Sequence, residues 1–149
     1  NNDDDIFVVL NDTSGAGLED PGDMILNGDG NVTVYLITDE GFKANGGEIN
    51  SGGDPAQFRM YITSDAKIKL GGNAEYTGVL YSRGSTFNES GGGTISVTGS
   101  IVVGTFDIEG GGNADFNFDP GVASVEPDFD ADTVKYLHVS ENEVRVELG

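Results

Sequence analysis

The sequence predicts an all-β protein, a single-stranded right-handed β-helix, or solenoid, of about four coils with short capping strands and a C-terminal hairpin. Three observations predict this fold: apolar patches recur, glycine runs follow them, and no segment sustains the 3.6-residue period of a helix. The patches start 25, 19 and 22 residues apart, a spacing typical of solenoid coils with three short strands per turn. Right-handedness follows from the usual crossover preference of parallel strands. The patches are VYLIT at 34–38, RMYIT at 59–63, GVLYS at 78–82 and SIVVG at 100–104.

Glycine runs after the patches predict the corners of the coils. The sequence has 24 Gly, and runs of two or three stand at 46–47, 71–72, 91–93 and 110–112. Gly adopts the positive φ that tight corners need without steric cost. A phosphate-binding loop would instead open a helix and usually carry a Lys, whereas these runs recur and lead into strand-like segments. We therefore interpret them as structural corners.

An alternating segment predicts which side chains fill the coils. In AKIKLGG, at 66–72, Ile68 shares one face with the other apolar residues, while Lys67 points to solvent. Shifting the sequence by 19 and then by 21 residues aligns Ile68 with Phe87 and Ile108. These three residues are expected to form a ladder of large apolar side chains through successive coils.

The whole chain, 1–149, is expected to be one β-solenoid domain, because its length suits a single hydrophobic core. In this division, residues 1–31 form an N-terminal strand and cap, residues 32–120 form the coils, and residues 121–149 form a linker and a hairpin. The hairpin is predicted because TVKYLHVSENEVRVELG is strand-like on both sides of a polar turn at 140–143.

Acidic residues dominate the charge of the chain, with 26 Asp and Glu against 7 Lys and Arg and a net charge of −19. Such a field repels nucleic acid and anionic membrane surfaces, so neither is an expected partner. Two explanations fit the charge, namely adaptation to high salt and a calcium-loaded surface. The acids are scattered along the chain and Lys is scarce, which favours salt adaptation.

The apolar segments are too short for direct membrane insertion. Runs such as IFVVL, at 6–10, fall far below the roughly 20 residues that cross a bilayer. No basic and apolar signal sequence is present, so the chain is expected to be cytoplasmic or a processed ectodomain that starts at Asn1. Three sequons favour an extracellular location, and the glycosylation sites that they predict are Asn11, Asn31 and Asn88.

Calcium is the one cofactor that the sequence suggests, although none is required. Asp29 lies in NGDGN, at 27–31, and Asp128, Asp130 and Asp132 lie in DFDAD. Both segments place oxygen ligands at alternate positions, as a hard cation needs. Neither completes an EF-hand loop, and the alternatives are an ordinary turn for the first segment and a solvated linker for the second.

No catalytic constellation is predicted. The chain has no Cys, and its single His, His138, is expected to be an exposed strand residue. Carbohydrate-active β-helices need clustered carboxylates, or carboxylates with a basic residue, beside a sugar groove. Arg59 and Arg83 fall near equivalent positions of adjacent coils and could stack. About four coils give little groove length, so a carbohydrate-binding or carbohydrate-active protein is the alternative to a non-enzymatic one.

The sequence resembles a known group of proteins over about three quarters of its length. The stretch from NVTVYLIT through GVLYSRGSTF to GSIVVGTFDIEGGGNADFNFD, with the closing VKYLHVSENEVRVE, is similar to a domain of archaeal, chiefly haloarchaeal, cell-surface proteins. Those proteins often carry a pilin-like membrane anchor, and their apolar N-terminal helix has no counterpart in this sequence. The resemblance implies the cell surface of a halophile, which fits the net charge.

The N-terminal strand is the predicted site of assembly. DIFVVLN is apolar on both faces, and a strand that is buried on both faces belongs inside a sheet. It is expected either to insert against its own first coil or to pair with an adjacent subunit, which would build a homopolymer by strand addition. The predicted function is a non-enzymatic structural subunit of an archaeal extracellular filament, surface layer or adhesin, with itself or other surface proteins as partners. The assembly residues are Ile6, Phe7, Val8, Val9 and Leu10.

Overall fold

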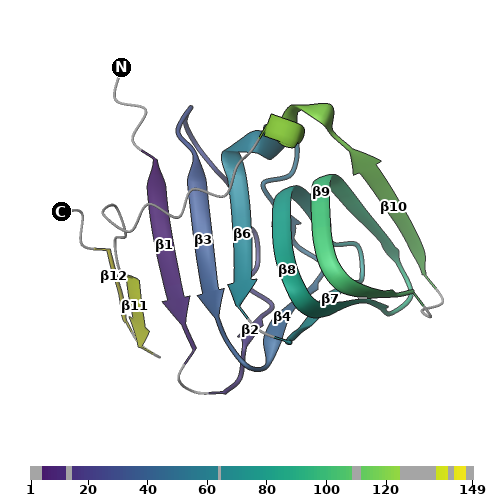
Figure 1. The fold of residues 1–149 in the computed structure, drawn as a ribbon, viewed down its shortest axis with the longest axis horizontal. Helices are drawn as coiled ribbons and strands as arrows, with labels where there is room; N and C mark the ends of the chain where they lie inside the picture. The colour runs from purple at the N-terminus through teal and green to yellow at the C-terminus, as the bar shows by residue number, and fades with distance from the viewer. Residues whose placement is uncertain are drawn as a thin grey trace.

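A computed structural model describes the residues 5–12, 15–63, 65–108, 112–124, 137–140 and 143–146. Strands make up most of this part of the chain, which contains no α-helix (Figure 1). Two short 3-10 turns, η1 (Pro55–Gln57) and η2 (Pro120–Ser124), also occur. The strands are β1 (Ile6–Asn11), β2 (Leu18–Glu19), β3 (Val32–Ile37), β4 (Gly41–Asn45), β5 (Glu48–Ile49), β6 (Phe58–Thr63), β7 (Lys67–Gly71), β8 (Glu75–Ser90), β9 (Thr94–Asp107), β10 (Asn113–Phe118), β11 (Leu137–Ser140) and β12 (Glu143–Val146).

The first ten strands form one sheet in which every paired strand is parallel. Its main path runs β1-β3-β6-β8-β7-β4-β2, while β5 and β9 pair with β8, and β10 pairs with β9. The long strands β8 and β9 bend sharply, so that the sheet curls into a half-barrel around its apolar face (Figure 1). The predicted all-β class is confirmed.

Paired residues on the inner face line up in three columns of apolar side chains. The first column crosses β1, β3, β6, β8 and β9, and successive members are 26, 26, 20 and 21 residues apart. Its three middle members are at most 3% exposed, whereas the members at its two ends are partly buried. The first column contains Val8, Val34, Met60, Leu80 and Ile101.

Two further columns repeat this pattern on the other parts of the curled sheet. Their middle members are also at most 3% exposed, so the three columns together form a large part of the hydrophobic core. Removing this apolar surface from water is the main stabilising contribution to such a fold. The second column contains Leu18, Phe42, Ile68, Phe87 and Phe106. The third column contains Met24, Ile49, Tyr76, Val97 and Phe116.

The patch spacing predicted from the sequence, 25, 19 and 22 residues, is wrong by one residue at each step. VYLIT begins with the inward-facing Val34, which pairs with Met60, whereas RMYIT begins with Arg59, which pairs with Thr33. Alternate residues of a strand face opposite sides of the sheet, so a slip of one residue exchanges the two faces. Apolar composition locates the strands but does not fix this register.

The predicted ladder is right at its first step and wrong at its second. Ile68 pairs with Phe87, and both side chains are 0% exposed. Phe87 then pairs with Phe106, whereas Ile108 lies beyond the end of β9 and is 51% exposed.

An irregularity in β8 explains the error at Ile108. The register of β8 against β9 shifts between Ser82 and Thr86, whose partners are Val103 and Thr105. The chain of β8 therefore has two more residues than β9 over this stretch, as in a β-bulge. The step between partners falls from 21 residues before the bulge to 19 after it, so a uniform shift of 21 overshoots the core position by two.

Glycine residues occupy the first three predicted corners, whereas residues 110 and 111 of the fourth run lie outside the described residues. Gly46, Gly47, Gly72 and Gly91 have φ values of 77°, 88°, 64° and 111°, in the region that L side chains rarely adopt. At Gly72 space is also limiting, because a Cβ there would lie 3.0 Å from the amide nitrogen of Gly46. Glycine thus allows the corners of neighbouring strands to stack directly on one another.

Both ends of the chain contain the predicted strands. The segment predicted to be an N-terminal cap contributes β1 and β2 to the main sheet, where they pair with β3 and β4. The C-terminal hairpin is present as β11 and β12, which pair antiparallel, with Ser140 opposite Glu143. This hairpin lies next to β1 without pairing with it (Figure 1).

Candidate interaction surfaces

β1 carries the predicted assembly residues and stands at one end of the strand order. It pairs along its whole length with β3 of the same chain, from Ile6 opposite Val32 to Asn11 opposite Ile37. Of the two arrangements that the sequence allowed, the structure therefore shows the intramolecular one. The other edge of β1 has no paired strand in the described part of the chain, so the parallel ladder ends there.

The side chains of β1 are covered on both faces of the sheet. Val8 and Leu10 pack against the hydrophobic core, and Val9, which points the opposite way, is only 9% exposed. Phe7 is half-buried, and Ile6 is 43% exposed. The expectation of burial on both faces is confirmed for the centre of the strand, and Ile6 is left as its exposed apolar residue.

Large apolar side chains are also exposed at the opposite end of the sheet, on β9 and β10. The second and third columns end there in Phe106 and Phe116, which are 48% and 41% exposed. The two rings lie 6.1 Å apart, edge to face, and each also packs against Phe87. Phe118, 67% exposed, and Ile101 join them around an open apolar hollow of about 350 Å³. The core is thus accessible to solvent where the columns stop.

A second hollow, of about 480 Å³, lies at the β1 end. Ile6, Ile25 and Val32 line it, and Ile25 is 66% exposed. Both ends of the curled sheet therefore present apolar side chains beside a strand edge, whereas the middle members of the columns are enclosed.

A row of tyrosines crosses the outer face of the sheet. Tyr35 and Tyr61 stack with ring centroids 5.3 Å apart, and Tyr61 and Tyr81 follow at 5.9 Å. Tyr61 is only 6% exposed, and this burial raises the pKa of its hydroxyl. Because its central ring is covered, the row contributes to packing on this face of the sheet.

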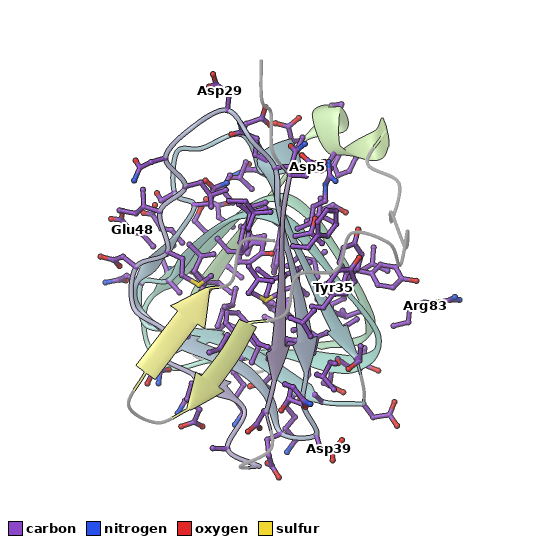
Figure 2. The ribbon with its side chains drawn as sticks, turned by 90° about the vertical axis from the view of Figure 1, so that its left-hand side faces the viewer. Asp5, Asp29, Tyr35, Asp39, Glu48 and Arg83 are labelled. Carbon is purple, nitrogen blue, oxygen red and sulfur yellow. The ribbon has the colours of Figure 1, made fainter. Side chains whose placement is uncertain are left out.

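The two arginines that the sequence placed at equivalent positions are not equivalent. Arg59 pairs with Thr33 on one side and with Val79 on the other. Arg83 lies in the β8 bulge and projects into solvent, away from the sheet (Figure 2). The predicted equivalence of the two arginines is therefore wrong, because the residue of β8 opposite Arg59 is Val79 and Arg83 lies further along the strand.

The acidic side chains are spread over the surface. Asp29, Asp39 and Glu48 project from different sides of the molecule (Figure 2). Lys43 and Glu19 form an ion pair at 3.7 Å between two exposed or half-exposed groups, an interaction of small net value in water. The charge therefore acts mainly as a general repulsion that salt can screen.

Of the four predicted calcium ligands, only Asp29 lies in the described part of the chain. Asp29 is exposed at the tip of a loop, with its carboxylate pointing outward (Figure 2). Asp128, Asp130 and Asp132 lie outside the described residues. Within the described ranges, no group of three or more His, Cys, Asp or Glu side chains converges on one point. Calcium at these four residues stays a prediction.

The three sequon asparagines differ in accessibility. Asn11 is exposed at the end of β1. Asn31 and Asn88 are half-buried, and their side-chain amides donate to Asp5 Oδ1 at 2.9 Å and to Asp107 Oδ2 at 3.2 Å. Glycosylation stays a prediction, and Asn11 is the site that a glycan could occupy without breaking a side-chain hydrogen bond of this kind.

One buried ionisable residue has no counterpart in the sequence analysis. Glu89, near the end of β8, is 3% exposed, and it pairs with the core residue Leu70. The sequence places it in the polar segment FNESGGG, which is typical of an exposed turn. Only the register, which puts Glu89 on the inward side with Leu70, reveals its burial.

The geometry defines a parallel all-β protein with an apolar strand edge at each end of one curled sheet. The chain belongs to a family of unknown function, DUF7305, whose sequence model matches residues 1–125. No curated protein and no solved structure matches it. In the described residues, no helix has the length and apolar character needed to span a membrane.

Proposed function

We propose that this chain is a non-enzymatic structural module of an extracellular surface structure, and that its sheet is a right-handed β-helix of about five coils, one more than the sequence predicts. Support for the β-helix comes from the order in which the chain visits the three columns. It passes through the first, second and third columns and then returns to the first, beginning with Val8, Leu18, Met24 and Val34. The parallel pairing and the stacked glycine corners suit the same arrangement.

The observation that carries the proposed function is the exposure of apolar residues beside both ends of the columns. The ends of a solenoid are covered either by polar caps or by another chain, because strand edges and core residues there have no neighbour. Here Phe106, Phe116 and Phe118 at one end, and Ile6 and Ile25 at the other, are each more than 40% exposed. Such ends suit association with a second copy of this chain.

In the proposed assembly, the β9–β10 end of one copy meets the β1 end of the next, and the β11–β12 hairpin, which lies next to β1 within one copy, is displaced from it. All strands of the main sheet are parallel, so the next copy can extend the ladder in the same direction as the pairs within one chain. The two surfaces are different, which makes the contact heterologous, and contacts of this kind build open filaments when the rotation does not close a ring. The assembly is therefore a homopolymer made by strand addition.

The location that we propose is the cell surface of a salt-adapted archaeon. The net charge of −19, the scarcity of Lys and the resemblance to haloarchaeal surface proteins support it. High salt screens the repulsion between equally charged copies, so a filament of such subunits is most stable where the ionic strength is high.

Two matched variants test the end-to-end contact. Phe118→Asp and Ile25→Asp change residues that are 67% and 66% exposed, one at each end, so neither change disturbs the core. In sedimentation velocity at molar KCl, the wild type is expected to form species that lengthen with concentration, and each variant to associate at least about tenfold more weakly. Ile37→Asp is the control, because Ile37 is 42% exposed but lies on β3, inside the sheet.

Mixing the two variants sharpens the test. Each retains one intact end, so an equimolar mixture is expected to form dimers and nothing longer. A wild type that stays monomeric at millimolar concentration in molar KCl would contradict the proposal, as would Ile37→Asp weakening association as much as the end variants do.

A further inference from the structure

Two rows of polar and charged residues run along the outer face of the curled sheet, one beside the second column and one beside the third. Their members alternate with the core residues along each strand, so they face the opposite side of the sheet. Neighbouring members lie on neighbouring strands, which are about 4.8 Å apart. The lysine row contains Glu19, Lys43, Lys69, Asn88 and Asp107. The acidic row contains Asp23, Glu48, Glu75, Ser96 and Asp115.

Each row places like charges directly opposite one another. Lys43 pairs with Lys69 in the lysine row, and Glu48 pairs with Glu75 in the acidic row. Like charges in such positions destabilise a sheet. In the described part of the chain Lys69 forms no ion pair, and Glu48 is exposed and projects away from the molecule (Figure 2). The two rows therefore carry opposite charges that folding of one chain leaves uncompensated.

A second copy of this chain has the charge that each row lacks. The sequence has four Lys, and three of them, at positions 43, 67 and 69, lie on the strands of the lysine row. Both rows follow the same strand spacing, so an ion pair made on one strand can be repeated on the next. We propose that the lysine row of one copy binds the acidic row of a second copy, side by side and with their strand stacks parallel.

The ends of the two rows determine the register of this contact. With both copies at equal height, Glu19 of one copy would face Asp23 of the other, and Asp107 would face Asp115. Both ends of the contact would then bring together like charges, which repel each other. The copies are therefore not at equal height.

A shift of one copy by one strand removes both repulsive pairs. Glu19 then has no residue of the acidic row opposite it, and Asp107 faces a hydroxyl group, which can donate a hydrogen bond to its carboxylate. Both lysines face carboxylates of the second copy. The facing pairs, with the second residue of each in the second copy, are Lys43 with Asp23, Lys69 with Glu48, Asn88 with Glu75, and Asp107 with Ser96.

This side-by-side contact uses neither the β1 end nor the β9–β10 end, so it does not depend on the end-to-end assembly proposed above. The repulsion between two chains of net charge −19 opposes the contact at low salt. At about 0.5 M KCl the Debye length is about 4 Å, so charges far apart are screened more than the ion pairs in direct contact. Association through the rows is therefore expected to be measurable at this salt concentration.

Reversing the charges of one facing pair tests the contact. All chains carry Phe118→Asp, so that end-to-end association does not contribute, and association is measured by sedimentation equilibrium at millimolar concentration in about 0.5 M KCl. Lys69→Glu and Glu48→Lys are each expected to weaken association about fivefold, because each turns an attraction into a repulsion. Combining the two is expected to restore association, since the pair is then reversed while the net charge is unchanged.

Asp29→Lys is the matched control for Glu48→Lys. Asp29 is exposed at the tip of a loop and belongs to neither row (Figure 2). Its replacement changes the net charge by the same amount as Glu48→Lys, and both changes lower the general repulsion between copies. Only Glu48→Lys is expected to weaken association, whereas Asp29→Lys should leave it unchanged or strengthen it.

Carbodiimide cross-linking identifies the residues that meet. The reagent joins an amine to a carboxylate in direct contact, and a mixture of isotope-labelled and unlabelled chains distinguishes links between copies by mass. Links between copies are expected from Lys43 to Asp23 and from Lys69 to Glu48. The ion pair between Lys43 and Glu19, at 3.7 Å, provides a link within one copy as the internal control.

Three results would overturn the proposal. The first is a Phe118→Asp chain that neither associates nor forms cross-links between copies under these conditions. The second is a double variant, Lys69→Glu with Glu48→Lys, that associates no better than the single variants. The third is an equal effect of Asp29→Lys and Glu48→Lys, which would indicate that net charge alone controls association.

Discussion

Replacing Phe87 by Ala tests the inner columns on which the fold depends. Phe87 is 0% exposed in the middle of the second column, between Ile68 and Phe106. Its ring also lies 5.8 Å from that of Phe116, so its removal leaves a cavity between side chains of neighbouring strands. Truncating a fully buried Phe costs about 3–5 kcal/mol of unfolding free energy. For a chain of this size, that loss lowers the Tm by about 6–20 °C.

Two controls show whether the loss follows burial. Phe106→Ala changes the next residue of the same column, which is 48% exposed, so it should cost about half as much as Phe87→Ala. Lys67→Ala changes an exposed side chain next to Ile68 and should cost less than about 0.5 kcal/mol. Urea unfolding at constant molar KCl, followed by circular dichroism, gives the three free energies. Equal and small effects of Phe87→Ala and Lys67→Ala would refute the register.

Three further predictions concern the chain as a whole. The Tm should be markedly lower in dilute buffer than in molar salt, because a net charge of −19 is poorly screened when the Debye length is about 30 Å at 0.01 M. A Tm that is the same in both buffers would remove the argument for salt adaptation. Burial raises the pKa of Tyr76 well above its ordinary value near 10, so with rising pH the unfolded chain loses the Tyr76 proton before the folded chain does. The contribution of Tyr76 to stability should therefore be full below about pH 10 and fall above it. Replacing Tyr76 by Phe should make this fall in stability less steep. Deleting residues 1–11 removes β1 and uncovers Val34 and Leu36, so it should lower the Tm, and a Tm equal to that of the full chain would contradict the pairing of β1 with β3.

The strands could be predicted from the sequence because their signals are local. Alternation in AKIKLGG correctly places Ile68 in the core and Lys67 outside it. The N-terminal strand, the C-terminal hairpin and the glycine corners are likewise where β-branched residues and Gly predict them. Each of these depends on a few consecutive residues, and no distant contact overrides it.

The register could not be predicted because it depends on residues in neighbouring strands. The two extra residues of the β8 bulge change the step between partners, and nothing in SRGS distinguishes a bulge from a continuous strand. The error at Ile108 follows directly from that. Glu89 was hidden for the same reason, since its burial comes from pairing with Leu70 and not from its polar neighbours.

The exposed apolar residues at the two ends of the sheet could be predicted only in part. The apolar residues of β1 are visible in the sequence, and they suggested an assembly strand. Phe106 and Phe116 look like ordinary core residues of alternating strands, and their exposure follows only from the absence of a further paired strand in the described part of the sheet. The apolar surface at the β9–β10 end can therefore be recognised only from the three-dimensional structure.

An engineered pair of cysteines tests the end-to-end contact most directly, because the chain has no Cys of its own. If the third column continues from Phe116 of one copy to Met24 of the next, then Asn117 lies opposite Ile25 of that next copy, within reach of a disulfide. Oxidation of Ile25→Cys/Asn117→Cys in molar KCl, followed by denaturing electrophoresis, should give a ladder of covalent multimers, while an equimolar mixture of the two single variants should give dimers only. Monomers alone from the double variant, or an equal ladder when Asn117→Cys is replaced by a cysteine at the inner-strand residue Ile37, would contradict the end-to-end contact.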